Sequence, residues 1–169
     1  METKVVAIAN YFINKGIEEE KPVSNLRLQK LMYFAWGEYW VWNKEHLFEE
    51  EFYSWKYDMY IPELHQKLKE INGDNFYLNN IRENFLLNKT IEGCDYVLNE
   101  KDINSIDKSY HKHKNMEYWD NPSLSTYVNS IRHTINKGIL SKERIKQRFD
   151  TMDYIYTNFG HVFKELAKM

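Results

Sequence analysis

Apolar side chains recur at three- and four-residue steps along much of this chain, which is the spacing of amphipathic α-helices. Gly16 follows the first such run, at a position where a left-handed residue commonly ends a helix. We therefore expect a first helix over residues 3–15 that stops at Gly16. Its apolar positions are Val5, Val6, Ala9, Phe12 and Ile13.

The second run is the longest and the most apolar. Ser24 is a good N-cap for it, and the pattern continues to about Asn43. Six of the ten residues from 33 to 42 are aromatic. At about 100° per residue, Phe34 lies nearly opposite Trp36 on a helix. The helix is therefore apolar nearly all round, which indicates either a central, sandwiched helix or a face kept for a partner. Its recurring positions are Leu28, Leu31, Met32, Ala35, Tyr39 and Trp42.

The middle of the chain mixes elements. Phe48, Phe52 and Trp55 favour a short extended piece or an irregular loop. Pro62 is tolerated in the first turn of a helix, and the next helix is expected to begin there and to stop at residues 72–73. Two Asn-rich stretches follow, over 79–87 and 90–99, each of which could be loop or short helix. The second could also be a short strand.

Three further helices are expected in the last third of the chain. One covers residues 102–115, and a second is capped by Ser123 and leads to a connection that ends at Gly138. Ser141 begins the last, with a break near Gly160. The pattern predicts a mainly α fold: a single compact helical domain over 1–169, with room for a short extended segment or a small hairpin.

Composition agrees with a globular protein. The chain has 169 residues, 28% of them charged, and only 6 Gly and 3 Pro. Cys94 is the single cysteine, so no intramolecular disulfide can form, as is usual in reducing compartments. The N-terminus shows no cleavable signal pattern, and no apolar run approaches the ~18 residues of a membrane helix. We expect a cytoplasmic protein that does not enter a membrane.

Charge is distributed unevenly. Residues 1–107 carry 12 basic and 19 acidic side chains, whereas residues 108–169 carry 11 and 6. The basic second half could face a polyanion, or the two halves could simply attract each other. Nucleic-acid contact by the final helix is the alternative to a solvated face, although charges spaced by two fan around a helix rather than forming one stripe. The residues concerned are Lys142, Arg144, Lys146 and Arg148.

No pattern indicates catalysis, a cofactor or a metal. The sequence lacks phosphate-binding glycine loops, nucleophile elbows and paired CxxC motifs. His111 and His113 stand two apart and would point to different faces of a helix, and Glu117 is within one turn of the second alone. A solvated polar face is favoured there. His133 could serve as an acid or base, but no nucleophile or carboxylate is placed beside it, so a packing role is favoured.

Three consecutive strings carry a family resemblance. They are "IANYFINKG", "VSNLRLQKLMYFAWGEYW" and "LFEEEFYSWKYDMYIPELHQKL", which occur in this order within a match that spans about residues 5–68. This compound signature resembles the start of the Panacea domain, the domain of SocA-like antitoxins and of phage-associated GepA-like proteins. The resemblance implies a compact, mostly helical domain of bacteria and prophages. Family members commonly neutralise a toxin encoded beside them, by direct binding or as an adaptor that delivers the toxin to a protease.

The resemblance favours a non-enzymatic binding protein whose partner is a toxin. Aromatic and arginine side chains dominate protein interfaces, so the aromatics left unburied are the candidate contacts, with Arg27 and Lys30 as pairing charges. A nucleic-acid-binding phage or prophage regulator is the first alternative, and an enzyme that uses His133 is the second. The candidate aromatic contacts are Trp36, Trp40, Trp42, Trp55, Tyr57 and Tyr60.

Overall fold

The structure is a computed structural model that describes residues 3–55, 58–72, 85–114 and 138–167. This part of the chain is mainly α, with one small antiparallel sheet, which confirms the predicted fold class. The elements are α1 (Lys4–Glu18), α2 (Asn25–Asn43), β1 (Phe52–Trp55), β2 (Asp58–Tyr60), α3 (Pro62–Asn72), α4 (Glu100–His113), β3 (Gly138–Leu140) and α6 (Lys142–Ala167).

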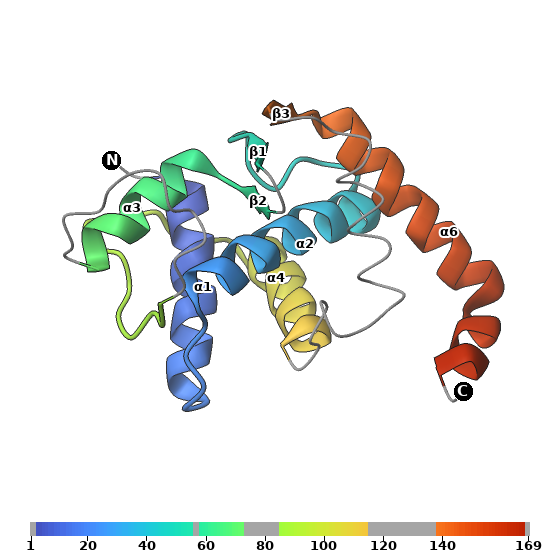
Figure 1. Cartoon of the computed structure of the whole chain (residues 1–169), viewed down its shortest axis with the longest axis horizontal. Helices are drawn as coiled ribbons and strands as arrows, with labels where there is room; N and C mark the ends of the chain where they lie inside the picture. The colour runs from blue at the N-terminus through green and yellow to red at the C-terminus, as the bar shows by residue number, and fades with distance from the viewer. Residues whose placement is uncertain (1–2, 56–57, 73–84, 115–137, 168–169) are drawn as a thin grey trace.

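Helix α2 is the centre of the fold. It crosses the middle of the molecule, with α1 and α4 on one side and the small sheet and α6 on the other (Figure 1). Tyr33, Phe34 and Trp36 point in different directions from α2, yet all three are buried. The indole N–H of Trp36 donates to the carbonyl of Phe48 at 2.9 Å, so its polar atom is also satisfied. Of the two explanations for an all-round apolar helix, the sandwiched one is confirmed for this stretch.

The expected helix starts are formed by side-chain caps. The backbone N–H of Arg27 donates to Ser24 Oγ at 3.1 Å, and that of Arg144 donates to Ser141 Oγ at 3.2 Å. Each cap satisfies one of the donors that the first turn of a helix leaves without a partner. The starts predicted from Ser24, Pro62 and Ser141 are therefore confirmed, whereas Ser123 lies outside the described residues.

The sheet has the strand order β2-β1-β3, and both pairings are antiparallel. Strands β1 and β2 form the small hairpin that the sequence allowed. The third strand was not predicted: Gly138, expected only to end a connection, begins β3 with φ of 142°. Leu140 pairs with Phe52, and both side chains are buried. A three-residue strand is too short to show an alternating pattern, so its signal is missing from the sequence.

Two expected helix ends were wrong. Helix α1 continues through Gly16 to Glu18, and Glu20 takes the left-handed conformation with φ of 58°. The N–H of Lys21 then donates to the Gly16 carbonyl at 2.8 Å, as in a Schellman motif. Gly16 is needed for another reason: a Cβ there would lie 3.0 Å from the backbone of Lys21 and Val23. The break expected near Gly160 is also absent, since α6 continues to Ala167.

Three amide side chains attach loops to the helices. Gln29 accepts from the N–H of Ile61 at 2.9 Å and donates to its carbonyl at 3.4 Å. Asn25 accepts from the N–H of Phe85 at 2.7 Å. Asn10 bonds both backbone groups of Ile91, at 2.7 and 3.0 Å. A side-chain amide has a carbonyl oxygen that accepts and an NH2 group that donates. It can therefore bond the N–H and the carbonyl of a backbone segment, as a neighbouring β-strand does. These polar residues of α1 and α2 therefore have a structural role, since they fix loop segments to the helices.

Candidate functional site

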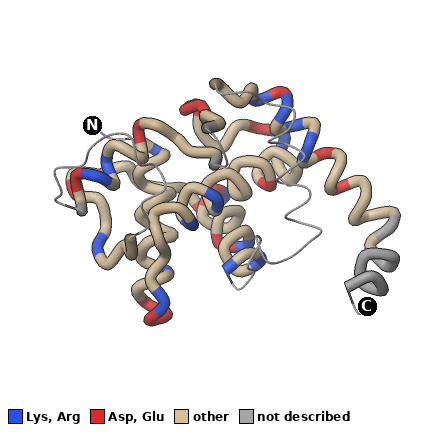
Figure 2. Tube along the Cα trace, in the orientation of Figure 1, with Lys and Arg blue, Asp and Glu red and all other residues tan. Residues whose placement is uncertain are grey.

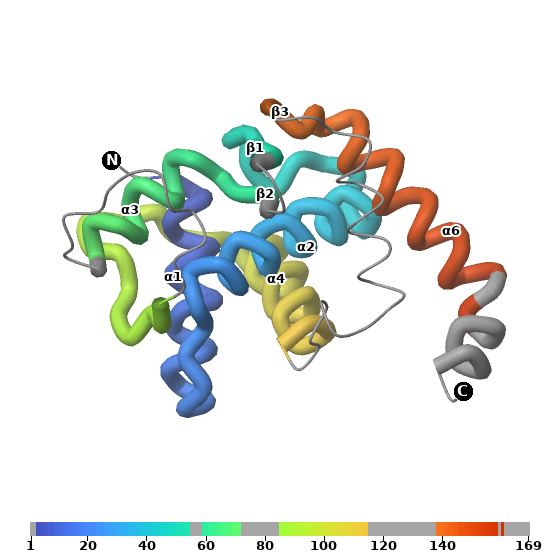
Figure 3. The backbone as a smooth tube through the Cα atoms, in the orientation of Figure 1, coloured from blue at the N-terminus to red at the C-terminus, as the bar shows by residue number. Residues whose placement is uncertain are grey.

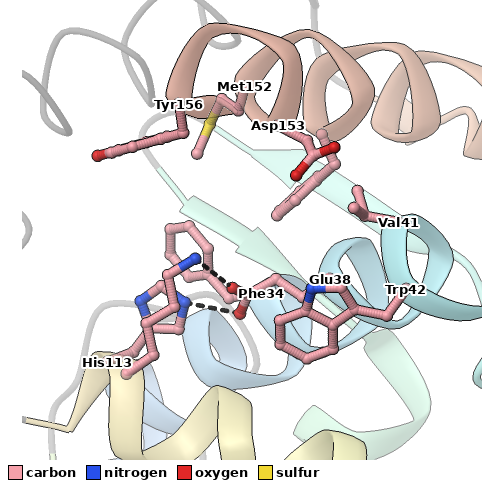
Figure 4. A pocket seen from close by; sticks show the side chains of 10 residues that line it. Phe34, Glu38, Val41, Trp42, His113, Met152, Asp153 and Tyr156 are labelled. Atoms are coloured by element: carbon pink, nitrogen blue, oxygen red, sulfur yellow. Dashed lines mark hydrogen bonds and ion pairs between the residues drawn. The ribbon is translucent and has the colours of Figure 1, made fainter. Parts of the chain in front are cut away.

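A pocket lies between α2, α4 and the middle of α6, and we call it the α2–α6 groove. Its empty volume is about 570 Å³, part of which is open to solvent. Met152, Asp153 and Tyr156 line it from α6, and Val41, Trp42 and Glu38 line it from α2 (Figure 4). Apolar walls with a few polar groups are typical of binding sites.

Its floor contains a buried carboxylate with three partners. Glu38 Oε1 accepts from Ser109 Oγ at 2.5 Å and lies 2.7 Å from His113 Nε2. Glu38 Oε2 lies 2.8 Å from Lys112 Nζ. We call Glu38, Ser109, Lys112 and His113 the Glu38 cluster. Because its three other members all come from α4, the cluster joins α4 to α2, and Figure 4 shows the two ion pairs of Glu38.

The charge of Glu38 is stabilised despite its burial. Burial by itself would raise the pKa of this carboxyl. The hydrogen bond and charge of His113, together with Lys112, more than offset burial and hold the pKa of Glu38 below its usual 4.5. The imidazole of His113 also stacks on Phe34, with ring centroids 4.5 Å apart. The cluster is therefore an ionic contact between helices, set beneath an apolar wall.

Within the Glu38 cluster, Ser109 is not paired with His113 as a nucleophile is with its base. A histidine activates a serine by accepting its hydroxyl proton, but the Ser109 hydroxyl donates to Glu38 Oε1, the oxygen that His113 Nε2 also contacts. The expectation of a solvated polar face was wrong for His113, which is 4% exposed, although the neighbouring His111 and Lys112 are exposed. His111 is exposed and faces Asp107 at 3.5 Å, so the two histidines diverge as their spacing predicted. Glu117 and His133 lie outside the described residues.

The tryptophans of α2 have three different environments. Trp36 is in the core at 1% exposure, so it offers no surface to a partner, and its inclusion among the contact candidates was wrong. Trp40 is half-buried; its indole N–H lies 3.2 Å from both carboxylate oxygens of Asp150, and Lys146 Nζ is 4.3 Å from its ring centroid. Trp42 is half-buried beneath Lys108, at 4.1 Å, and lines the α2–α6 groove. Only Trp42 borders this candidate site.

The other predicted contacts do not gather around the groove. Tyr60 is half-buried on β2, with its ring 5.7 Å from that of His65. The Arg27 guanidinium donates to the carbonyl of Lys114, so it joins the start of α2 to the end of α4. Lys30 is half-buried and also makes an interaction within the protein. The side chain of Trp55 and all of Tyr57 lie outside the described residues.

Four basic residues lie in the first two turns of α6, as Figure 2 shows, and acidic Asp150 and Asp153 follow them. Lys142 donates to the Glu49 carbonyl at 2.8 Å. Lys146 pairs with Glu143 at 3.2 Å and covers Trp40. Arg144 and Arg148 also interact within the protein. These four side chains do not form one exposed stripe for phosphates, and at least two of them stabilise the fold.

Trp42 is the one predicted contact residue that lines the groove; the sequence pattern did not indicate the others. The position of Glu38 in the sequence could have indicated a special role. It is an acidic residue within an apolar run, and residues 31–39 of that run are all buried. Met152, Asp153 and Tyr156 had no such signal, because their place opposite α2 depends on how α6 packs. No helix in the described part of the chain has the length and apolar character needed to cross a membrane.

The fold and the groove define a small, mainly helical protein with a partly apolar recess between its longest helices. The chain belongs to the family described as "Antitoxin SocA-like, Panacea domain", whose model matches residues 28–128. It is 34% identical over 73 residues to Antitoxin SocA of Caulobacter vibrioides (strain NA1000 / CB15N). That alignment covers 43% of this chain and 38% of the relative, so the chain matches well under half of the relative's length. No solved structure matches it.

Proposed function

We propose that this chain is an antitoxin that binds a cognate protein toxin in the cytoplasm and neutralises it. The observation that carries the proposal is the family match over residues 28–128, which includes all of α2 beyond its first turn and all of α4. The relative with 34% identity is itself named an antitoxin. The toxin is expected to be encoded beside this chain, in a prophage or toxin–antitoxin locus.

The proposed action is binding rather than catalysis. The buried carboxylate of Glu38 is paired with Ser109, Lys112 and His113 across two helices, which is a structural use of its charge. The α2–α6 groove offers apolar surface of the kind that a partner protein covers. The toxin would be held either in a direct complex or as cargo that this chain delivers to a protease.

Expression of the adjacent reading frame tests the proposal. That gene alone should arrest growth, and co-expression of this chain should restore it. Toxin abundance then separates the two modes: sequestration leaves the toxin at full level, whereas delivery to a protease lowers it. A neighbouring product that is harmless alone, or growth arrest that this chain does not relieve, would refute the antitoxin proposal.

A further inference from the structure

We propose that the toxin docks in the α2–α6 groove, through an amphipathic segment with an apolar edge and a Lys or Arg that pairs with Asp153; this inference rests on the proposed function. It names a site and a partner chemistry that family membership does not supply. Three features of the groove support this docking site. They are an apolar stripe on α6 that extends beyond its buried part, a floor whose buried charge is already paired, and an acidic side chain on the rim.

The apolar stripe runs along one side of α6. Ile145, Phe149, Met152 and Tyr156 stand four, three and four residues apart, so they lie on one face of the helix. Ile145 and Phe149 are buried against the body of the protein. Met152 is half-buried, and Tyr156 is 53% exposed. The red, coloured end of α6 projects beyond the remaining described elements (Figure 3), so the same stripe continues where the described part of the chain covers it less.

The floor of the groove needs no further charge. Glu38 already has Lys112 at 2.8 Å and His113 at 2.7 Å. A partner that placed another charge on this floor would have to separate a buried ion pair, which is strongly unfavourable. The part of the partner that enters the groove should therefore be apolar, filling the space between Trp42, Phe34 and Met152.

The rim of the groove carries the carboxylate of Asp153, which is exposed and has no cation beside it among the described residues. The nearby Asp150 differs, since Lys44 lies 3.1 Å from it and the Trp40 indole donates to it. A Lys or Arg of the partner would form an ion pair with Asp153. Arg is favoured because its flat guanidinium can also stack on the aromatic rings of Trp42 and Tyr156, which line the same groove.

The charge of the groove favours a protein over a nucleic acid. Asp153 would repel a phosphate backbone, the charge of Glu38 is already balanced by Lys112, and the four basic residues in the first two turns of α6 (Figure 2) do not line the groove. An aromatic and apolar recess with a charged rim is the usual composition of a protein–protein hot spot. The partner is thus expected to contribute an apolar anchor and a flanking cation.

Calorimetric titration of the full chain against the purified product of the adjacent reading frame tests the docking site. Asp153→Lys and Met152→Asp should each raise the dissociation constant by about tenfold or more, as for a hot-spot residue. Tyr154→Lys is the matched control: Tyr154 is on the same helix and 63% exposed, and it does not line the groove. Its dissociation constant should stay within about twofold of wild type, as for a contact outside the interface.

The possible outcomes are distinct. If the wild-type chain does not bind, the proposed function fails. If it binds and both groove variants bind equally well, the docking site is wrong while the antitoxin function stands. If the wild-type chain self-associates in sedimentation velocity and Met152→Asp abolishes this, the groove holds a second copy, and the inference is overturned. Helical content by circular dichroism identifies a misfolded variant, and Asp153→Lys, altered at an exposed site, then decides.

Discussion

The ring of Phe149 lies against the backbone of Gly37, so closely that a Cβ added at Gly37 would come within 2.2 Å of it. This contact is where α6 approaches the central helix α2. No side chain other than hydrogen fits there, and the ring also meets Tyr33 and Phe34 edge-on. Close packing of α6 on α2, which forms one wall of the groove, therefore requires a residue without a side chain at position 37.

Gly37→Ala should lower the free energy of unfolding by about 1–3 kcal/mol, because the added methyl overpacks the α2–α6 contact. Denaturant unfolding followed by circular dichroism measures this loss. Gly160→Ala is the control, since nothing lies within 4 Å of a Cβ at that position of α6. It should be neutral or stabilising by up to about 1 kcal/mol, the helix preference of Ala over Gly. Equal effects of both substitutions would contradict the described packing.

Glu38→Gln should destabilise the protein most at neutral pH. The pKa of Glu38 is lower in the folded chain than its usual 4.5, so the carboxylate contributes stability above that pH and loses it as pH falls through the folded pKa. The loss at pH 7 should be about 1–3 kcal/mol, as for a hydrogen bond to a buried charged group.

Chemical unfolding at several pH values measures the difference between wild type and Glu38→Gln. That difference should shrink below pH 4.5. Glu92→Gln is the control, because it makes the same substitution at an exposed position and should leave the free energy of unfolding nearly unchanged. A constant difference from pH 7 to pH 3, in contrast, would mean that the charge of Glu38 contributes nothing.

His65 should remain neutral in mildly acidic solution. Burial, followed by the nearby charge of Lys69, lowers the pKa of His65 from 6.5 to about 4. The unfolded chain takes up this proton near pH 6.5 and the folded chain only near pH 4, so stability falls as pH drops through that interval. NMR titration of the imidazole gives the midpoint, and His65→Gln should remove this part of the acid sensitivity. A midpoint near 6.5 would show that the ring is solvated.

Gln29→Leu should cost about 1–3 kcal/mol of stability, because the N–H and carbonyl of Ile61 would lose their partner in a buried setting. Gln147→Leu makes the same chemical change at an exposed position of α6 and should have little effect. Thermal unfolding of the two variants compares them. If the two variants have the same midpoint of thermal unfolding, the Gln29 amide is not a required contact between α2 and the residues before α3.

Much of the helical framework could be predicted, because caps and apolar spacing are local signals. Ser24 and Ser141 mark helix starts that the structure confirms, and of the two explanations for the aromatic run of α2 the structure confirms the sandwiched helix. The errors concern residues whose role depends on distant parts of the chain. Gly16 looked like a helix end, yet it is kept small by a chain that folds back over it.

The candidate site was less predictable for the same reason. His113 has the polarity of a surface residue, and only its pairing with Glu38, 75 positions away, explains its burial. Trp36 was an attractive contact residue by type, but a side chain's type does not reveal which neighbours cover it. The α2–α6 groove arises from the crossing of helices far apart in sequence, and no pattern within one helix encodes that crossing.

If this chain neutralises a toxin by binding it, the two proteins should form a stable complex when they are purified and mixed. Size-exclusion chromatography with light scattering should show one complex. Its mass should correspond to a whole number of copies of each of the two proteins. Intact mass spectrometry should find both proteins chemically unchanged. If growth is rescued in cells while the purified proteins form no complex, or if the toxin emerges covalently modified, the account of neutralisation by binding is contradicted.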